Sequence, residues 1–542
     1  MRADVAHEAH VLVIGSGGAG VRAALEASRY GETLLVTKSV AGKGGCTPMA
    51  EGGYNAALRE ADSCVGHLED TVKGGAYLND LELVQVLVNE APERLRDLVR
   101  WGAVFDVTGT CEVAQRSFGG QRFPRTCYAG DRTGHEMMMT LLEQIRASEV
   151  EVLQEVTVTD LLTREGAVVG AAVLDRTGKL EVIRADSTIL ATGGGSRVYD
   201  VSTNSATGTG DGYSLGYRAG AELIDMEMVQ FHPTGAVYPY DARGRLVTEA
   251  VRGEGGILRN AKGERFMSRY DPERMELSTR DVVARAIARE IQEGRGTARG
   301  GVYLDVTHLP GEQIEERLPV MLEQFLAYGV DIRKEPMEVA PSAHHFMGGL
   351  RITPTGQSTV PGLFACGEVA GGVHGANRLG GNSLAETQVF GKRAGEAAGR
   401  APTRGQRPEQ RQLDLIERRL EVFLSGMVNP VMVERKLQLA MWKGAGIFRT
   451  GPELEQTLIE VEKLGRKKIH ALSKLNLAEC MTVQHLCTTA FLVVKSALLR
   501  KESRGAHVRT DISQTHDAAN SPYGHTYLSL NRSGIEMKGG SP

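Results

Sequence analysis

The sequence predicts an α/β protein with a Rossmann-like first domain, an inserted α+β segment and a helical C-terminal region. Residues 10–15 form a short apolar run, a helix-like stretch follows from Gly18 to about Arg29, and residues 33–38 are strand-like again. A strand–helix–strand opening of this kind is typical of dinucleotide-binding folds. Residues 230–345 are rich in Gly, Arg, Glu and Pro, and residues 411–500 show mostly the periodicity of amphipathic helices.

Further elements follow from the same periodicity. Helices are expected at 82–100, at 133–147 and from about Ser383 to Arg400, and strands within 152–174, 188–195 and 363–370. Residues 401–410 contain two prolines among polar residues and indicate a linker. The polar tail beyond Arg509 is expected to be loop-like.

The composition is that of an ordinary globular protein with one unusual feature, its glycine content. The chain has 542 residues, of which 41% are hydrophobic and 24% charged. Its 66 glycines are roughly one residue in eight, against about one in fourteen on average. Because glycine lets the backbone approach a ligand closely, this excess favours a large bound cofactor. The net charge of −4, without a long basic stripe, argues against nucleic acid as a partner.

The sequence also indicates where the protein is located and what its cysteines do. No run reaches the roughly 18 apolar residues of a membrane helix, so direct membrane insertion is not expected. The residues ahead of the first strand are few and include His7 and Glu8, so no signal peptide is expected. We expect a cytoplasmic protein, either free or held at the cytoplasmic face of a membrane by partner subunits. The seven cysteines form no CxxC pair, so neither a disulfide framework, a metal site nor an iron–sulfur cluster of the chain's own is expected.

The first motif is Gly15-x-Gly17-x-x-Gly20, between the first strand and the first helix. The first glycine permits a tight turn, the second lets the backbone touch a pyrophosphate, and the third packs the helix on the strand. The helix N-terminus then offers N–H groups to the phosphates. The second strand ends in Thr37-Lys38-Ser39, without the carboxylate that usually binds the ribose of NAD. A plain NAD site is therefore disfavoured.

Other glycine segments recur far along the chain, at 44–53, 191–194 and 367–368. FAD is long, and distant segments must converge along it. The presence of all these segments in this order favours FAD over a set of unrelated turns.

Five further blocks carry candidate chemistry. They are QFHPT (230–234), TEAVRGEGG (248–256), TRDVV (279–283), HHFMGG (344–349) and HGANRLGGNSL (374–384). A small dicarboxylate needs two anion sites, which histidines, a threonine hydroxyl and a forked arginine can supply.

These blocks, and the chain from about residue 10 to 510, resemble the flavoprotein subunit of the succinate dehydrogenase and fumarate reductase family, and more distantly L-aspartate oxidase. The resemblance implies an FAD-binding domain built from residues 1–228 and 346–400, a capping domain at 229–345, and a C-terminal helical domain and tail at 401–542. It implies that fumarate and succinate are interconverted by hydride transfer at the flavin, with a lean towards fumarate reduction. An iron–sulfur subunit is implied as the partner.

The resemblance also assigns roles by position. His232, Thr248, His344 and Arg378 match the residues that grip the substrate carboxylates. Arg280 matches the proton shuttle, and Glu249 and Arg252 match the relay that serves it. The residues expected to contact FAD are Gly15, Gly17, Gly18, Ala19, Gly20, Thr37, Lys38, Ser39, Gly45, Cys46, Thr47, Gly52, Gly53, Ala191, Thr192, Gly193, Asp211, Glu368, Asn382, Ser383 and Leu384.

One position departs from the family pattern. Most members attach FAD covalently through a histidine in a His-Thr pair, and here that pair reads Cys46-Thr47. Non-covalent FAD is therefore expected, with a thioether from Cys46 as the alternative. Three rival functions stay open: an L-aspartate oxidase, an NAD-dependent dehydrogenase and a non-catalytic flavoprotein subunit. The electron donor and the physiological direction are not fixed by the sequence.

Overall fold

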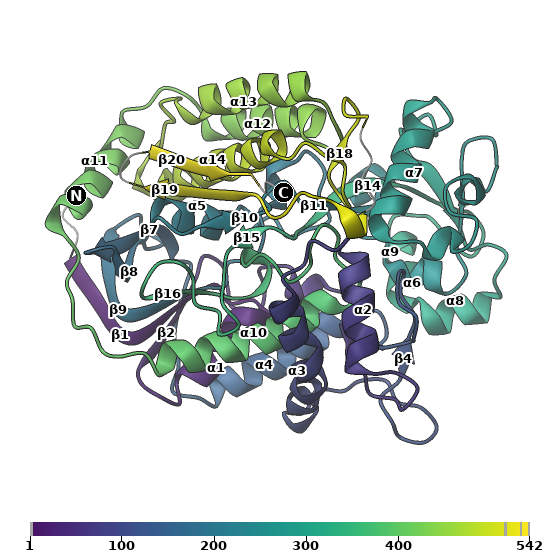
Figure 1. Cartoon of the computed structure of the whole chain (residues 1–542), viewed down its shortest axis with the longest axis horizontal. Coiled ribbons are helices and arrows are strands. Elements are labelled where there is room, and N and C mark those ends of the chain that lie inside the picture. Colours follow the sequence, from purple (N-terminus) through teal and green to yellow (C-terminus); the bar gives the residue numbers. More distant parts are fainter. Residues whose placement is uncertain (1–3, 514–517, 532–533, 540–542) are drawn as a thin grey trace.

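The structure is a computed structural model that describes residues 4–513, 518–531 and 534–539. A main body carries a lobe at one end, whose core is formed by residues between 236 and 339 and which is called the insert below (Figure 1). The helices are α1 (Gly18–Ala27), α2 (Cys64–Gly74), α3 (Leu81–Arg100), α4 (Thr133–Arg146), α5 (Asp211–Arg218), α6 (Glu249–Gly253), α7 (Arg280–Gln292), α8 (Gly311–Arg317), α9 (Pro319–Leu326), α10 (Asn382–Gly399), α11 (Gln410–Leu424), α12 (Pro430–Gly444), α13 (Gly451–Gly465) and α14 (Leu477–Leu499).

The longer strands are β1 (Asp4–Ile14), β2 (Thr33–Thr37), β6 (Glu151–Gln154), β7 (Thr157–Arg164), β8 (Ala167–Leu174), β9 (Leu180–Leu190), β11 (Val229–Tyr238), β12 (Ile257–Arg259), β13 (Val302–Asp305), β14 (Met337–Phe346), β16 (Leu363–Ala365), β19 (Tyr527–Asn531) and β20 (Gly534–Lys538). Two-residue strands are β3 (Tyr54–Asn55), β4 (Gln115–Arg116), β5 (Thr126–Cys127), β10 (Leu223–Ile224), β15 (Gly349–Leu350), β17 (Phe448–Arg449) and β18 (Val508–Arg509).

The main sheet has the order β6-β2-β1-β9-β8-β7, with β16 paired to β9. Strands β6, β2, β1, β9 and β16 are parallel, whereas β7 and β8 form an antiparallel extension. The parallel strands β2 and β16 and residues 11–14 of β1 are buried and mostly apolar, as expected for strands covered on both faces, whereas the edge strand β6 is half-buried or exposed. In such sheets, ligands bind at the carboxyl ends of the strands, so the fold already indicates where a site should lie.

Helices α1 and α10 cross closely against this sheet, although more than 350 residues separate them in the sequence (Figure 1). Glycines recur every fourth residue of α10, at Gly391, Gly395 and Gly399, on the face that meets α1. A Cβ added to Gly395 would lie 2.3 Å from the carbonyl oxygen of Ala23. Only glycine permits this approach, which brings the N-termini of both helices to the same edge of the sheet.

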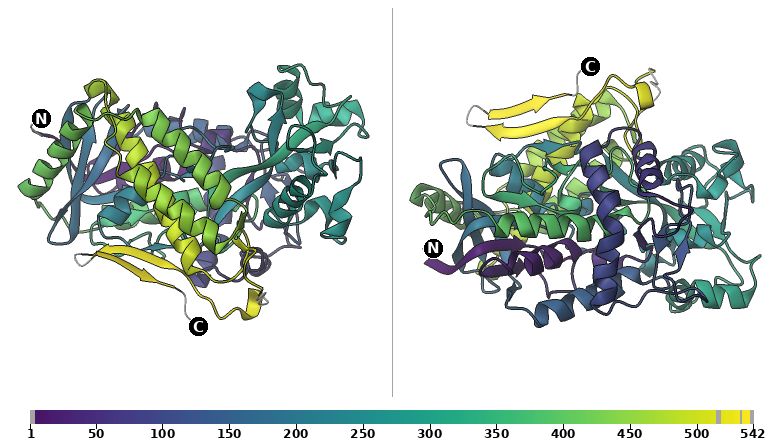
Figure 2. Two further views of the ribbon diagram at one scale, coloured as in Figure 1. Left: turned by 90° about the horizontal axis from the view of Figure 1, so that it is seen from above. Right: turned by 60° about the horizontal axis from the view of Figure 1, so that its bottom comes forward.

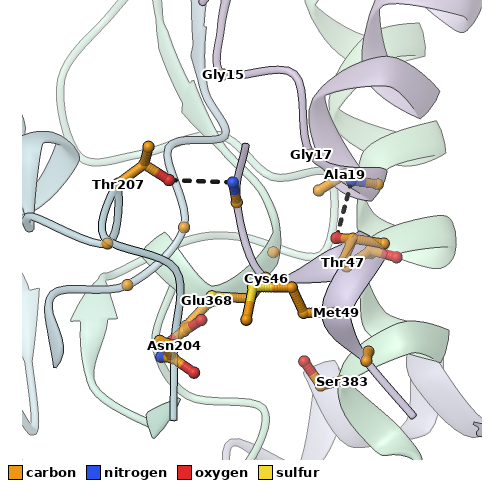
Figure 3. Close-up of a pocket in the computed structure, with 18 of the residues that line it drawn as sticks. Gly15, Gly17, Ala19, Cys46, Thr47, Met49, Asn204, Thr207, Glu368 and Ser383 are labelled. Carbon is orange, nitrogen blue, oxygen red and sulfur yellow. Dashed lines mark hydrogen bonds between the residues drawn. The ribbon is translucent and has the colours of Figure 1, made fainter. Parts of the chain in front are cut away.

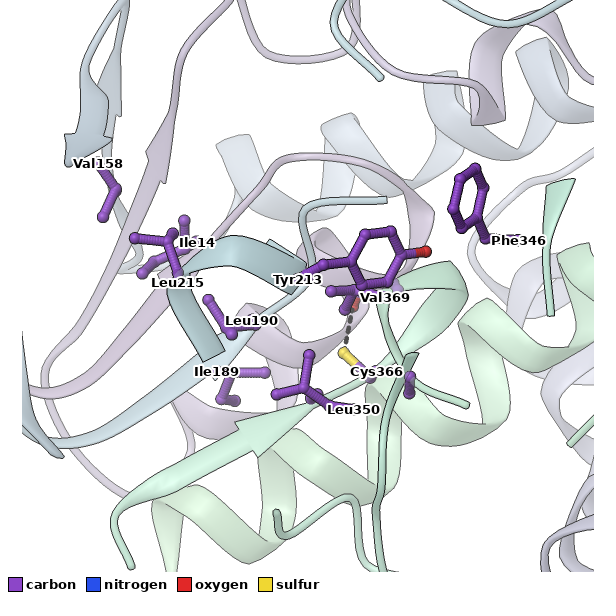
Figure 4. Packing of buried hydrophobic residues seen from close by; sticks show 14 of the residues in the cluster. Ile14, Val158, Ile189, Leu190, Tyr213, Leu215, Phe346, Leu350, Cys366 and Val369 are labelled. Carbon is purple, nitrogen blue, oxygen red and sulfur yellow. Dashed lines mark hydrogen bonds between the residues drawn. The ribbon is translucent and has the colours of Figure 1, made fainter. Parts of the chain in front are cut away.

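The insert has a hydrophobic core of its own, formed by residues between 236 and 339. Its antiparallel sheet has the order β11-β14-β13-β12. Strands β11 and β14 pair from Val229 with Phe346 to Tyr238 with Glu338, and so run from the main body into the insert. The residues at the main-body ends of these two strands therefore lie at the junction of the two cores. Figure 4 shows Phe346 beside Tyr213, and the rings stack at 5.4 Å between centroids.

The C-terminal region is helical from α11 to α14, as predicted, and these helices cover one side of the main body (Figure 2). The prediction of a loop-like tail was wrong in part. Strands β19 and β20 form a hairpin, and β19 pairs with β10 of the main body. The tail is polar in composition, but Leu528 on β19 is fully buried against the main body.

One helical segment among the described residues, Lys474–Leu499, is long and apolar enough to cross a membrane by composition. It contains α14, which packs among α5, α12 and α13, and 67% of its most apolar stretch is buried. Its hydrophobicity on all sides is accounted for by this burial, as in the core helix of a large protein.

Candidate active site

A long pocket lies at the carboxyl ends of β1, β2 and β9, where the fold indicates a site. All residues expected to contact FAD line it except Gly20 and Asn382. His232, Thr248, His344, Arg378, Arg280 and Glu249 line it too, whereas Arg252 does not. Figure 3 shows part of the pocket, with Gly15, Gly17, Cys46, Glu368 and Ser383 arranged around it.

The glycine motif forms one end of the pocket. Gly15 has φ of +112°, and a Cβ there would lie 2.3 Å from the carbonyl oxygen of Ala191. Gly20 faces away from the pocket, because its Cβ position lies 1.8 Å from the carbonyl oxygen of Gly15. Gly20 therefore packs helix on strand and supports the site without lining it. Gly17 is the N-cap of α1 and has no side chain to bond the first turn. Apart from the Gly18 N–H, which donates to Thr47, the backbone N–H groups of this turn are therefore left for an anion.

Lys38 follows β2, where an NAD site would place a carboxylate. Its Nζ donates to Asp211 Oδ2 at 2.7 Å and also bonds Thr209. Asp211 begins α5, and burial, which alone would raise its pKa, is outweighed by Lys38 and His485, so its pKa is well below the usual range. The carboxylate beside Lys38 is thus that of Asp211, over 170 residues later in the sequence.

The middle of the pocket is formed by the segment from Gly44 to Gly53. Thr47 Oγ1 accepts from the Gly18 N–H at 3.1 Å, and Gly45 N–H donates to Thr207 Oγ1 at 3.0 Å (Figure 3). The half-buried Cys46 thiol has its pKa raised to about 12, first by desolvation and then by Glu368. Asn382 lies behind the pocket, where its amide oxygen is within 2.9 Å of His67 Nε2 and accepts from Asn55 Nδ2 at 2.7 Å.

These features fit FAD. The pocket is elongated, has two uncapped helix N-termini on its wall, at α1 and α10, and is lined by glycines along its length. Thr192 Oγ1, buried at the pocket wall, has no hydrogen-bond partner among the described residues. A bound polar group would satisfy it.

The far end of the pocket holds the predicted substrate residues. His232 on β11 and His344 on β14 come from paired strands, and their ring centroids are 5.0 Å apart. Thr234 N–H donates to His232 Nδ1 at 3.3 Å, so His232 Nε2 is the nitrogen that carries a proton. His344 Nδ1 lies 2.7 Å from Thr203 Oγ1. Thr248 is the N-cap of α6 and is buried at the same end.

Arg280 begins α7 and reaches the same end of the pocket. Its Nε donates to Glu249 Oε2 at 2.8 Å, and Glu249 Oε1 accepts from Gly119 N–H at 2.8 Å. Arg252, one turn after Glu249 on α6, lies 3.8 Å from Glu249 Oε1. Arg252 is buried behind Glu249, which is why it does not line the pocket.

Comparison with known proteins places the chain in a family. Residues 10–384 match the FAD binding domain family, and residues 434–538 match the fumarate reductase flavoprotein C-terminal family. The chain belongs to the succinate dehydrogenase and fumarate reductase flavoprotein family. It is 52% identical to one of the subunits of fumarate reductase (CoM/CoB) from Methanothermobacter marburgensis, over 94% of this chain and 95% of that protein. It is 38% identical to the mitochondrial succinate dehydrogenase flavoprotein subunit of rice, over 95% of this chain and 87% of that one.

Solved structures agree with this membership. The E. coli quinol fumarate reductase matches with a TM-score of 0.92 and 35% identity, over 98% of this chain and 96% of that one. Adenylylsulfate reductase from Archaeoglobus fulgidus, at 18% identity and a TM-score of 0.82, shares the fold alone. The cofactor of this flavoprotein is FAD, and the chain is an oxidoreductase. This sets aside the NAD-dependent dehydrogenase and the non-catalytic subunit.

The end of the flavoprotein's pocket that holds the predicted substrate residues is positively charged. Burial and the nearby Arg280 hold the pKa values of His232 and His344 well below the usual range, so both rings are neutral. Burial, reinforced by Arg280, lowers the pKa of Arg378 to about 9. Burial would raise the pKa of Glu249, but Arg280 and Arg252 outweigh it and hold that pKa at about 2. Three buried arginines thus face one ionised glutamate, an excess of positive charge that suits a dianion.

Two residues of this end were missed by sequence reasoning. Gln230, fully buried, accepts from Arg280 Nη1 at 3.3 Å and from Arg378 Nη2 at 3.2 Å through one oxygen. It therefore holds both arginines, and its only signal was its place in the QFHPT block. His345 lines the pocket beside His344. Elsewhere in the pocket, sequence reasoning also missed Thr203, Asn204, Thr207 and Gly208, whose signal was the small polar run ahead of Asp211.

Proposed function

We propose that this flavoprotein interconverts fumarate and succinate, with a lean towards fumarate reduction, as the catalytic subunit of a complex with an iron–sulfur protein. The observation that carries the proposal is the pair of neutral histidines and buried arginines at one end of an FAD pocket. A planar four-carbon dianion complements this end in charge and in its two separated anion sites.

Substrate binding is assigned to four side chains. His232 donates from Nε2 to one carboxylate, and Thr248 and His344 lie at the same end of the pocket. Arg378 faces the pocket with its fork oriented by Gln230 and binds the other carboxylate. Because these donors are fixed by buried hydrogen bonds, they need little reorganisation as charge develops on the substrate.

Proton transfer is assigned to Arg280. Its Nε and Nη1 are engaged by Glu249 and Gln230, which leaves Nη2 for the substrate carbon. An arginine releases a proton only to a strongly basic atom, because its pKa normally exceeds about 12. The carbon next to the site of hydride addition becomes such an atom. Glu249 and Arg252 then return a proton to Arg280.

When bound, FAD supplies the hydride chemistry that no side chain provides. Non-covalent binding is supported by Cys46, because a thiol with a pKa near 12 has almost no thiolate to attack the ring. Without a covalent link, the flavin potential is expected to be low, which favours fumarate reduction over succinate oxidation.

The assembly and domain division are proposed on the same basis. Relatives named as subunits of fumarate reductase and succinate dehydrogenase support a partner subunit that brings electrons. We place the chain in the cytoplasm, free or held at the membrane by such partners. The separate core of the insert supports a capping domain at 229–345, between FAD-binding parts at 1–228 and 346–400, followed by the C-terminal domain at 401–542.

The test is fumarate-dependent oxidation of reduced viologen by the purified chain. Arg280→Lys should lose at least about 99% of this activity, because removal of a group that acts only in the transition state typically costs about 10²-fold or more. Arg289→Ala, on the exposed side of the same helix, is the matched control and should keep full activity. FAD content is measured by absorbance in all three proteins.

Two outcomes would count against the proposal. Near-normal activity of Arg280→Lys with full FAD content would remove Arg280 from the chemistry. Hydrogen peroxide formation with aspartate, in a protein inactive towards fumarate, would assign the chain to the L-aspartate oxidase alternative.

A further inference from the structure

Behind the substrate end of the pocket, four buried titratable side chains follow one another in a row. Glu368 Oε2 lies 3.6 Å from His345 Nδ1, and the rings of His345 and His374 are 5.4 Å apart between centroids. His374 Nε2 lies 2.9 Å from Glu386 Oε2. We call this set, Glu368, His345, His374 and Glu386, the carboxylate–histidine row.

The row runs from the pocket wall into the interior. Glu368 and His345 line the pocket, whereas His374 and Glu386 do not. Glu386 lies on the second turn of α10, near the positive end of the helix whose first residues, Ser383 and Leu384, line the pocket.

The row has spare capacity for protons. His345 Nε2, His374 Nδ1 and Glu386 Oε1 are buried and have no hydrogen-bond partner among the residues that the structure describes. Unpaired buried nitrogen and oxygen atoms are costly in a native protein and usually have a function or a bound partner. The proposed hydride and proton steps at Arg280 use none of these atoms.

The charged groups around the row act in opposite directions. Burial holds the pKa of His345 well below the usual range, reinforced by Arg378 and by His374 of the row, and then by His344 and Arg280 on the substrate side. Burial raises the pKa of Glu368 to about 7, with Glu386 acting in the same direction and Arg378 against it.

Neutral or weakly acidic groups complete the surroundings. Cys46 and Tyr213 lie near Glu368, and Cys366 lies near Glu386. Their pKa values are raised, in each case first by burial, so these groups stay neutral near pH 7. A buried carboxyl with a pKa near 7 at the pocket wall is balanced between its two states, so a small change of charge nearby can shift its protonation.

We propose that the carboxylate–histidine row takes up one proton from solvent when an electron pair enters the flavin, and releases it when the pair leaves. A nearby negative charge raises the pKa of carboxyl and imidazole groups, so the row binds a proton as that charge arrives. The row is thus a second proton site, separate from the Arg280 relay. This proposal rests on the FAD site and not on the identity of the substrate.

The proposal balances over one cycle. A one-electron carrier, of the kind that an iron–sulfur subunit provides, delivers two electrons in turn. These two electrons and one proton stay on the cofactor until they leave together as hydride. The second proton goes to the row and compensates the remaining negative charge. After the hydride has left, the substrate carbon receives its own proton from Arg280, and the row returns its proton to solvent.

The test is the dependence of the flavin midpoint potential on pH, measured by spectroelectrochemistry of the holoprotein without fumarate. In the wild type, between about pH 6 and pH 8, the slope should correspond to about two protons per electron pair, because the slope is proportional to the protons bound. In Glu386→Gln and in His374→Asn it should fall to about half. The matched control is His507→Asn, which alters another buried histidine, bonded to Arg449 and outside the pocket lining, and it should keep the wild-type slope.

Three results would overturn the proposal. A wild-type slope that corresponds to a single proton would show that the row does not titrate with reduction. An unchanged slope in both variants would place the second proton elsewhere, and the near-ultraviolet spectrum of the reduced holoprotein would show whether the ring itself binds it. A stoichiometric divalent metal in the purified protein, lost in Glu386→Gln, would assign the row to metal binding, since the ligand atoms of His345, His374 and Glu386 lie within 4.8 Å of one another. FAD content and thermal unfolding are measured to check whether each variant is folded. The wild-type slope tests the proposal even if a variant fails to fold.

Discussion

Gln230→Leu should separate the orientation of the two arginines from the binding of FAD. The Gln230 side chain makes four hydrogen bonds, two of them accepted from the guanidinium groups of Arg280 and Arg378. The other two go from its amide to Asn377 Oδ1 and to the Arg378 carbonyl, at 2.9 and 2.8 Å. Leucine keeps most of the volume and removes all four, so the substitution tests polarity with little change in packing.

The magnitude follows from the two charged bonds. A hydrogen bond to a charged group contributes about 1.5 to 3 kcal/mol. Arg280 keeps its bond to Glu249, so we take the lower figure for each arginine and expect a loss of about 3 kcal/mol, or about 10²-fold in kcat/KM. Because the proposed function assigns substrate binding to Arg378 and proton transfer in the transition state to Arg280, KM should rise and kcat should fall.

The assay is viologen-linked fumarate reduction at several fumarate concentrations, with FAD content and thermal unfolding measured alongside. Gln412→Leu is the matched control. It also removes hydrogen bonds of a glutamine side chain, but those to Leu161 and Thr163 on β7, away from the pocket, and it should leave kcat/KM unchanged. A fall of less than about threefold in Gln230→Leu, with full FAD content, would refute the claim that Gln230 orients both arginines.

Three further predictions follow from single contacts. Gly380→Ala should lower kcat at least about tenfold with FAD retained, because its Cβ would lie 2.9 Å from Glu249 Oε2 and 3.1 Å from Arg280 Nη2; full activity would contradict this packing. The pKa of Glu249 falls from its ordinary 4.5 to about 2 on folding, so its stabilisation is complete above pH 4.5 and is lost as the pH falls towards 2. Chemical denaturation should therefore show a larger stability deficit of Glu249→Gln at pH 6 than at pH 3, and equal deficits would be the contrary result. Acid precipitation should release all flavin into the supernatant from both the wild type and Cys46→Ser; a yellow pellet from the wild type alone would indicate a thioether.

Much of the fold could be predicted because its signals are local. The strand–glycine–helix opening at Gly15 places the nucleotide end of the pocket, since turn geometry and close approach leave few other residues possible there. Helix periodicity located α3, α4 and α10 to within a few residues. The tail hairpin was missed because β19 is defined by its pairing with β10, some 300 residues away, and not by its own composition.

Within the site, the amino-acid sequence limits which residue types are available, and folding brings particular ones of them together. From the sequence, Lys38 showed only that the usual carboxylate after β2 is absent. Its ion pair with Asp211 forms because folding brings the start of α5 close to the end of β2. Gln230 and His345 stood in recognisable blocks without roles, because their roles depend on Arg378 and Glu368 from distant segments. Charge states depend even more on folding, since burial and neighbouring charges shift the pKa of a side chain only once the chain has enclosed it.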